Sequence, residues 1–229
     1  MEHARERISY LESGDTAGTP GMPVVLLHDI GPLHSVDEVS DLFDRLAEDR
    51  VVVAPDLSHR VLSHDDYLEL VAGLVAEVAA RHHATVDVVA VGSMGELAAE
   101  AIVRASRHVR SLAIVSPTGF RPRHLVARLR AKARTRLASF VGLADPNVAT
   151  RTYAALPVPT CFVHGEGEDV GKGDIDRRCL RRAEVARAMK HPHRERPLAT
   201  AAALRAFWRT VAHKPELRVI RGGRDEHAR

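Results

Sequence analysis

The sequence has few of the features that mark secreted and membrane proteins. It contains two cysteines among 229 residues, Cys161 in an apolar run and Cys179 in a charged one. Two cysteines in such settings make no disulfide framework and suit a reducing compartment. No apolar run approaches the roughly 20 residues that span a bilayer, and Met1 is followed by charged residues instead of the apolar stretch of a signal peptide. These absences predict a cytoplasmic protein without a membrane partner.

An excess of one charge is also absent. The 33 lysines and arginines are nearly offset by 30 acidic residues, so the formal net charge is only +3 although the pI is near 9.1. A nucleic-acid-binding protein usually gathers its positive charge on one face, so we expect a small-molecule substrate and no nucleic-acid partner. Hydrophobic residues make up 45% of the chain, which at this length predicts one domain with a sizeable core. The oligomeric state stays open.

Short apolar runs alternate with segments of helical periodicity. Residues 24–27 are wholly apolar and lack the alternation of a half-exposed strand, which indicates a strand buried on both faces. Comparable runs lie at 51–54, 86–91, 112–115, 160–163 and 217–220, and residues 8–10 form a shorter β-like run. Between them, apolar residues recur at helical spacing over 36–46, 68–78 and 97–105. This alternation predicts an α/β fold, with a mostly parallel central sheet and helices on both faces.

Two basic segments interrupt the alternation. Residues 117–155 carry an apolar stripe surrounded by arginines, and we expect a short helical cap inserted into a single domain that spans 1–229. The alternative is a surface helix with a solvated basic face. Arginines also crowd 177–190, where we expect a helix, and a second helix is expected over about 199–211. His191 and His193 flank a proline, but no third ligand stands at a supporting spacing, so we expect an exposed loop and no metal site.

The most informative segment is VDVVAVGSMGELAA, residues 86–99. A buried strand leads into Gly92, Ser93, Met94 and Gly95, and a helix begins directly after them. A sharp strand-to-helix turn can hold a serine hydroxyl above the sheet, where a histidine can reach it. The N-terminal N–H groups of the following helix then face the site and suit a developing oxyanion.

This segment resembles the nucleophile elbow of the α/β-hydrolase family, commonly Gly-x-Ser-x-Gly. Five further segments resemble the family in the same order: RISYLESG at 7–14, VVLLHD at 24–29, VVVAPDL at 51–57, RSLAIVSPTGF at 110–120 and LPVPTCFVHGEGED at 156–169. The resemblance implies the α/β-hydrolase fold and hydrolysis of a small ester, thioester or lactone without a cofactor.

The resemblance also implies roles for individual residues. Ser93 would be the nucleophile, and the backbone N–H groups of Ile30 and Met94 would form the oxyanion hole. Glu168 or Asp169 would orient the general base. That base would be His227, because LRVIRGG at 217–223 resembles the last strand and the glycine turn that precede the family's histidine.

Three departures from the family pattern keep a second function open. Counted along the strand, the family's serine falls on Gly92, which has no hydroxyl. Asp29 stands where the family has glycine, and its carboxylate would oppose the charge that the oxyanion hole stabilises. His227 lies two residues beyond the usual histidine position. The alternative is therefore a non-hydrolytic or catalytically degenerate protein of this fold, with a binding, scaffold or cyclase-like role. A dinucleotide-binding domain is disfavoured, since Gly92-x-x-Gly95 is too short for Gly-x-Gly-x-x-Gly.

Overall fold

The apolar runs of the sequence form one central sheet. The computed structural model describes residues 9–13, 21–31, 34–58, 62–117, 156–166, 168 and 180–212. Its strands are β1 (Tyr10–Glu12), β2 (Val24–Leu27), β3 (Val52–Pro55), β4 (Val86–Val91), β5 (Val109–Val115), β6 (Thr160–Gly165) and β7 (Leu180–Val185). They lie in the order β1-β3-β2-β4-β5-β6-β7. β1 pairs antiparallel with β3, and every other pair is parallel.

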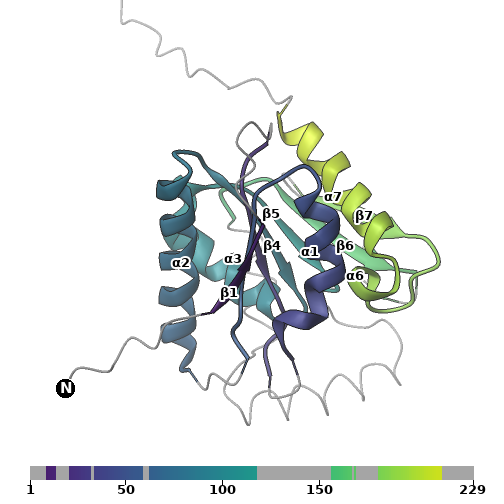
Figure 1. Cartoon of the computed structure of the whole chain (residues 1–229), viewed down its shortest axis with the longest axis horizontal. Coiled ribbons are helices and arrows are strands. Elements are labelled where there is room, and N and C mark those ends of the chain that lie inside the picture. Colours follow the sequence, from purple (N-terminus) through teal and green to yellow (C-terminus); the bar gives the residue numbers. More distant parts are fainter. Residues whose placement is uncertain are drawn as a thin grey trace, which may run out of the picture.

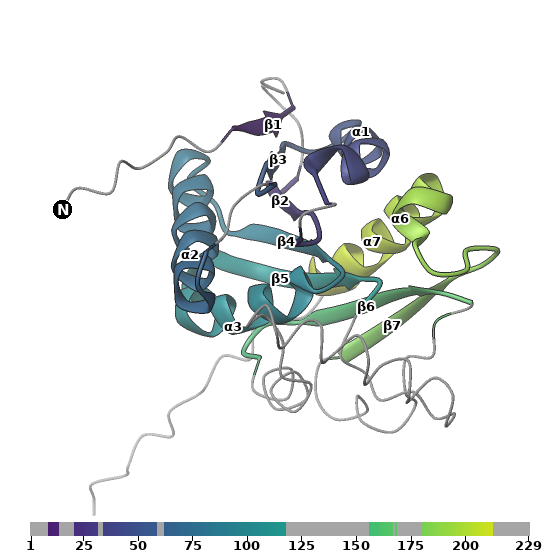
Figure 2. The same ribbon diagram turned by 90° about the horizontal axis from the view of Figure 1, so that it is seen from below.

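Helices cover both faces of this sheet (Figures 1 and 2). The helical elements are η1 (Val36–Val39), α1 (Ser40–Ala47), α2 (His64–Arg81), α3 (Met94–Ala105), η2 (Ser106–His108), α6 (Pro192–Glu195) and α7 (Pro197–Ala212). α2 and α3 pack on one face, and α1 and α7 pack on the other. Because both faces are covered, β2 and β4 are buried along their whole length, which explains why β2 is wholly apolar and β4 is apolar except for Asp87.

Helix α2 shows how local sequence sets an element's start. Ser63 and Asp66 form a capping box, in which the serine hydroxyl accepts the N–H of Asp66 and the aspartate accepts the N–H of Ser63. Each group satisfies a backbone donor that the first turn of a helix otherwise leaves open. From this start, α2 presents Leu68, Val71 and Val75 to the sheet.

The predicted α/β architecture is confirmed, and the prediction for 177–190 is wrong in part. Residues 180–185 form the edge strand β7, parallel to β6, instead of a helix. Only one side of an edge strand is paired, so Arg181, Arg182 and Glu184 stay exposed, and this charged sequence hides the strand from a search for apolar runs. The exposed loop expected around His191 and His193 is also only half correct, since α6 begins there and His193 is 2% exposed.

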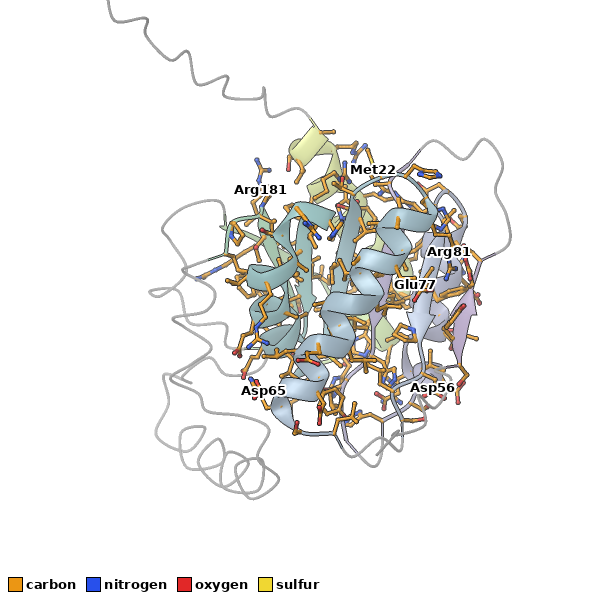
Figure 3. All side chains as sticks on the ribbon, turned by 90° about the vertical axis from the view of Figure 1, so that its left-hand side faces the viewer. Met22, Asp56, Asp65, Glu77, Arg81 and Arg181 are labelled. Atoms are coloured by element: carbon orange, nitrogen blue, oxygen red, sulfur yellow. The ribbon has the colours of Figure 1, made fainter. Side chains whose placement is uncertain are left out.

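The parallel strands place their carboxyl ends at one edge of the sheet. Figure 3 shows the two edges, with Met22 just before β2 at one end and Asp56 just after β3 at the other. The predicted cap, from residue 118 to 155, and the predicted strand 217–220 lie outside the described residues. None of the described helices is long and apolar enough to cross a membrane.

Candidate active site

The turn between β4 and α3 is the predicted elbow. Gly92 has φ +60°, whereas Ser93 has ordinary right-handed angles, φ −69° and ψ −22°. The Gly92 N–H donates to the Val115 carbonyl of the neighbouring strand at 2.9 Å, and the Gly95 N–H donates back to the Gly92 carbonyl at 3.2 Å. Left-handed backbone is the conformation that glycine adopts without steric cost. The residue at the apex of the turn is therefore Gly92, and Ser93 is the residue that follows it.

The carboxylate of Asp29 fills the space in front of this turn. Its Oδ1 accepts the backbone N–H of Ile30 at 2.9 Å and the backbone N–H of Ser93 at 2.9 Å. The Ser93 hydroxyl donates to the same oxygen at 2.5 Å. Three donors thus converge on one anionic oxygen, which is the arrangement that an oxyanion hole offers to a substrate.

The donors that converge here differ in one residue from the predicted oxyanion hole. Ile30 lies where it was expected, but the second N–H belongs to Ser93 and not to Met94. The physical reason is the position of the apex. The second N–H group of an oxyanion hole belongs to the residue after the apex. With Gly92 at the apex, that residue is Ser93.

Gly92 and Asp29 occupy adjoining space. A Cβ on Gly92 would overlap the Asp29 carboxylate, and even the most distant of its three side-chain atoms in reach, Oδ1, would lie only 2.7 Å away. Real Cβ atoms almost never approach another atom so closely. The carboxylate can therefore lie in front of the elbow only because the apex residue has no side chain.

His28 fixes the backbone of the Asp29 loop. Its Nε2 accepts the Leu57 N–H at 2.8 Å, so its Nδ1 carries the proton and donates to the Asp29 carbonyl at 2.7 Å. The ring is 1% exposed, and burial lowers its pKa, although the Asp29 carbonyl and the carboxylate of Asp56 oppose this shift. With both nitrogens committed to backbone groups, His28 orients the loop instead of exchanging protons with Ser93.

Glu168 lies at the same edge, at the end of β6. Its Oε2 accepts the Gly165 N–H at 2.8 Å. Burial raises the pKa of Glu168 to about 7, opposed mainly by the hydrogen bond from the Gly165 N–H. Ser116 has a left-handed backbone, φ +53°, and its hydroxyl donates to the Lys190 carbonyl at 2.8 Å. Such backbone strain in a non-glycine residue gathers at functional sites. The sequence assigned no role to Ser116, and it marked Lys190 only as part of the basic segment 177–190.

Two further residues of the predicted triad cannot be placed relative to Ser93. Asp169 and His227 lie outside the described residues. Within them, the partner of the Ser93 hydroxyl is a carboxylate and not an imidazole. The described residues also contain no cluster of three or more histidine, cysteine, aspartate or glutamate side chains that could hold a metal ion.

A second histidine near this edge is buried and neutral. His193 on α6 is 2% exposed, and its Nδ1 has no hydrogen-bond partner in the described structure. Burial lowers the pKa of His193 to about 3, and the nearby His191 and Arg194 add to the shift. Its ring packs edge-on to His191, with centroids 5.9 Å apart. The burial of His193 was missed because a proline and two charged residues surround it in the sequence.

Solved structures of other proteins share this fold. A structure of an α/β-hydrolase enzyme from a metagenome of lagoon sediments at Mar Chica, Morocco, is 18% identical, with a TM-score of 0.63 over 89% of this chain and 95% of that one. The thioesterase domain from the curacin biosynthetic pathway is 16% identical, with a TM-score of 0.61 over 86% and 94%.

A third solved structure, 2-hydroxy-6-oxo-6-phenylhexa-2,4-dienoate hydrolase from Rhodococcus sp. strain RHA1, is 16% identical, with a TM-score of 0.59 over 89% of this chain and all of that one. No family model matches the sequence, and no curated protein matches it. The chain has the α/β-hydrolase fold, as its motifs predicted.

Proposed function

We propose that this chain is a non-hydrolytic protein of the α/β-hydrolase fold, which binds a small molecule at the carboxyl edge of its sheet without cleaving it through a serine nucleophile. The observation that carries the proposal is the Asp29 carboxylate, held by the N–H groups of Ile30 and Ser93 and by the Ser93 hydroxyl. The donors that would stabilise a tetrahedral intermediate already bind an anion of the protein itself.

The energetic consequence for ester hydrolysis is large. Two like charges about 4 Å apart repel by roughly 4 kcal/mol at an effective dielectric constant of about 20. An oxyanion that developed beside Asp29 would meet a penalty of this order, which slows a reaction by about a thousandfold. The absence of a side chain on Gly92 also removes the hydroxyl from the apex, the position from which a nucleophile reaches the substrate.

One contact favours the other candidate, serine hydrolysis of a small ester, thioester or lactone. The Ser93 hydroxyl lies 2.5 Å from Asp29 Oδ1 and is half-buried, so the carboxylate could accept its proton. In that arrangement, however, Asp29 Oδ1 would be both the general base for the Ser93 hydroxyl and the acceptor of the N–H groups of Ile30 and Ser93. The same carboxylate cannot leave the donors free for an oxyanion while it holds the serine proton.

Labelling with a fluorophosphonate probe separates the two functions. We expect no adduct on Ser93 and no acyl-enzyme burst with a p-nitrophenyl ester, for the wild-type chain and for Ser93→Ala alike. Ser116→Ala, which removes another hydroxyl at the same edge, serves as the matched control. Labelling that disappears in Ser93→Ala but persists in Ser116→Ala would overturn the proposal and establish the hydrolase.

A further inference from the structure

The opposite edge of the sheet carries a basic hollow. It lies where α1 and the start of β3 meet α7. Helices α1 and α7 run side by side in Figure 1. Its volume is about 330 Å³, and its lining residues are Asp49, Arg50, Ala202, Arg205 and Arg209. Three guanidinium groups face one carboxylate there, which leaves an excess of two positive charges among the lining residues.

Arg50 is held rigidly on one side of the hollow. Its Nη1 donates to Asp87 Oδ2 at 2.8 Å and to the Met22 carbonyl at 3.0 Å, and its guanidinium stacks 4.2 Å from the centre of the Trp208 ring. Asp87 is fully buried and also accepts hydrogen bonds from Arg110. Two arginines therefore share one buried carboxylate, and this cluster retains a positive charge that burial leaves poorly solvated.

Arg205 is fixed on the other side. Its Nε donates to both oxygens of Asp49 at 3.1 Å, and its Nη2 donates to Asp49 Oδ1 at 2.8 Å and to the Arg45 carbonyl at 2.6 Å. Glu48 lies 3.5 Å from the same Nη2. Arg209 follows one helical turn later on the same face of α7, where it is exposed. The hollow thus has two immobilised guanidinium groups and a third at its rim.

We propose that this hollow binds a small phosphate-bearing anion. The planar guanidinium fork matches phosphate oxygens in pairs, and arginine is favoured over lysine for this purpose. Groups that are already fixed by protein partners lose little conformational entropy when a ligand binds. The volume, about 330 Å³, is at the lower end of the range for small-molecule sites and accommodates a phosphate or diphosphate group.

The protein contains its own reporter of this site. Trp208 is the only tryptophan of the chain, and its ring stacks directly on Arg50. An anion that binds the Arg50 guanidinium changes the electrostatic field at the indole. Emission from Trp208 can therefore be followed while the full chain is titrated with pyrophosphate, with sodium chloride adjusted to hold the ionic strength constant.

Two variants test the location without disturbing the buried cluster. Arg209→Gln removes the rim guanidinium, and Ala202→Glu adds a carboxylate to the lining at an exposed helix position. We expect a saturable emission change in the wild type and affinity about tenfold weaker in either variant, because Arg209→Gln loses one charge-assisted hydrogen bond to the anion and Ala202→Glu adds a negative charge that repels it. Arg104→Gln, an exposed arginine of α3 on the other face of the sheet, is the matched control and leaves the affinity unchanged.

Several results would overturn this assignment. They are an emission change that chloride reproduces, no saturable change at all, or a loss of affinity as large in Arg104→Gln as in Arg209→Gln. A response to a short DNA duplex but none to pyrophosphate would also exclude a small anion. Because the hollow lies at the amino ends of the strands, none of these outcomes bears on the Asp29 site at the carboxyl ends.

Discussion

A double-mutant cycle at positions 29 and 92 tests whether one carboxylate and one glycine form a single structural unit. In Gly92→Ala, the new Cβ would overlap the Asp29 carboxylate, and alanine would adopt the left-handed backbone of φ +60°. The backbone term costs about 1–2 kcal/mol. Expulsion of Asp29 from its three donors adds about 2–3 kcal/mol. We therefore expect Gly92→Ala to lower the free energy of unfolding by about 3–5 kcal/mol.

The second arm of the cycle removes the carboxylate first. Asp29→Gly alone should cost about 2–3 kcal/mol, because the same three hydrogen bonds are lost and glycine adds backbone entropy. In Asp29→Gly with Gly92→Ala, the overlap is gone and the hydrogen bonds are lost only once. The double variant should therefore be more stable than the sum of the single variants predicts, by about 2–3 kcal/mol.

Urea denaturation followed by circular dichroism measures all four free energies of unfolding. Gly73→Ala is the matched control, since a Cβ at Gly73 in α2 meets nothing within 4 Å and should stabilise the helix by up to about 1 kcal/mol. Additivity at positions 29 and 92 within about 0.5 kcal/mol would refute the reasoning, since it would mean that the two side chains do not compete for the same space.

Three further predictions concern buried polar groups. Burial raises the pKa of Glu168 to about 7, so the folded state binds the extra proton, and stability should fall as the pH rises from about 4.5 to 7, by up to about 3 kcal/mol. In Glu168→Gln this fall should disappear from urea denaturation at pH 5 and pH 8, whereas parallel profiles would exclude it. Asp87→Asn should cost about 3–5 kcal/mol, because Arg50 and Arg110 lose their shared buried carboxylate; a loss below 1 kcal/mol in thermal unfolding would contradict this. His28→Ala should cost about 2–4 kcal/mol, since the Leu57 N–H loses its acceptor and a buried ring leaves a cavity, and unchanged stability would show that the ring does not fix the loop.

Much of the fold could be predicted from local sequence because the central strands are buried on both faces. Residues 24–27 are apolar throughout, and residues 86–91 are apolar except for Asp87, a pattern that strands buried on both faces require. The same reasoning did not predict β7, because this edge strand is paired on one side only and its Arg181 and Arg182 side chains are exposed. Its place in the sheet comes from pairing with β6, which local sequence does not encode.

Two residues of the candidate site, Asp29 and Gly92, could be singled out from the sequence, but the geometry of the site could not. The sequence marked Asp29 and Gly92 as departures from the family pattern, and both lie at the centre of the site. What the sequence does not contain is the direction of the Asp29 side chain, which depends on the His28 ring and on the two converging N–H groups. The N–H groups that bind Asp29 are those of Ile30 and Ser93, whereas the sequence predicted Ile30 and Met94 as the oxyanion donors. This difference is a single residue of register, and chain spacing alone cannot fix register at a turn.

Two of the three departures from the hydrolase pattern, Asp29 and Gly92, are physically one change. Asp29 can lie in front of the elbow only when the apex has no Cβ, and an apex without a side chain has no nucleophile. A carboxylate at position 29 therefore requires the loss of the apex hydroxyl, and an apex serine would require the carboxylate to leave its donors. If the proposed non-hydrolytic function is correct, neither single reversal should produce serine hydrolase activity, because Asp29→Gly leaves the apex without a side chain and in Gly92→Ser the new side chain meets the Asp29 carboxylate. Any path back to serine chemistry at this elbow must change both positions, and the first step of that path lowers stability.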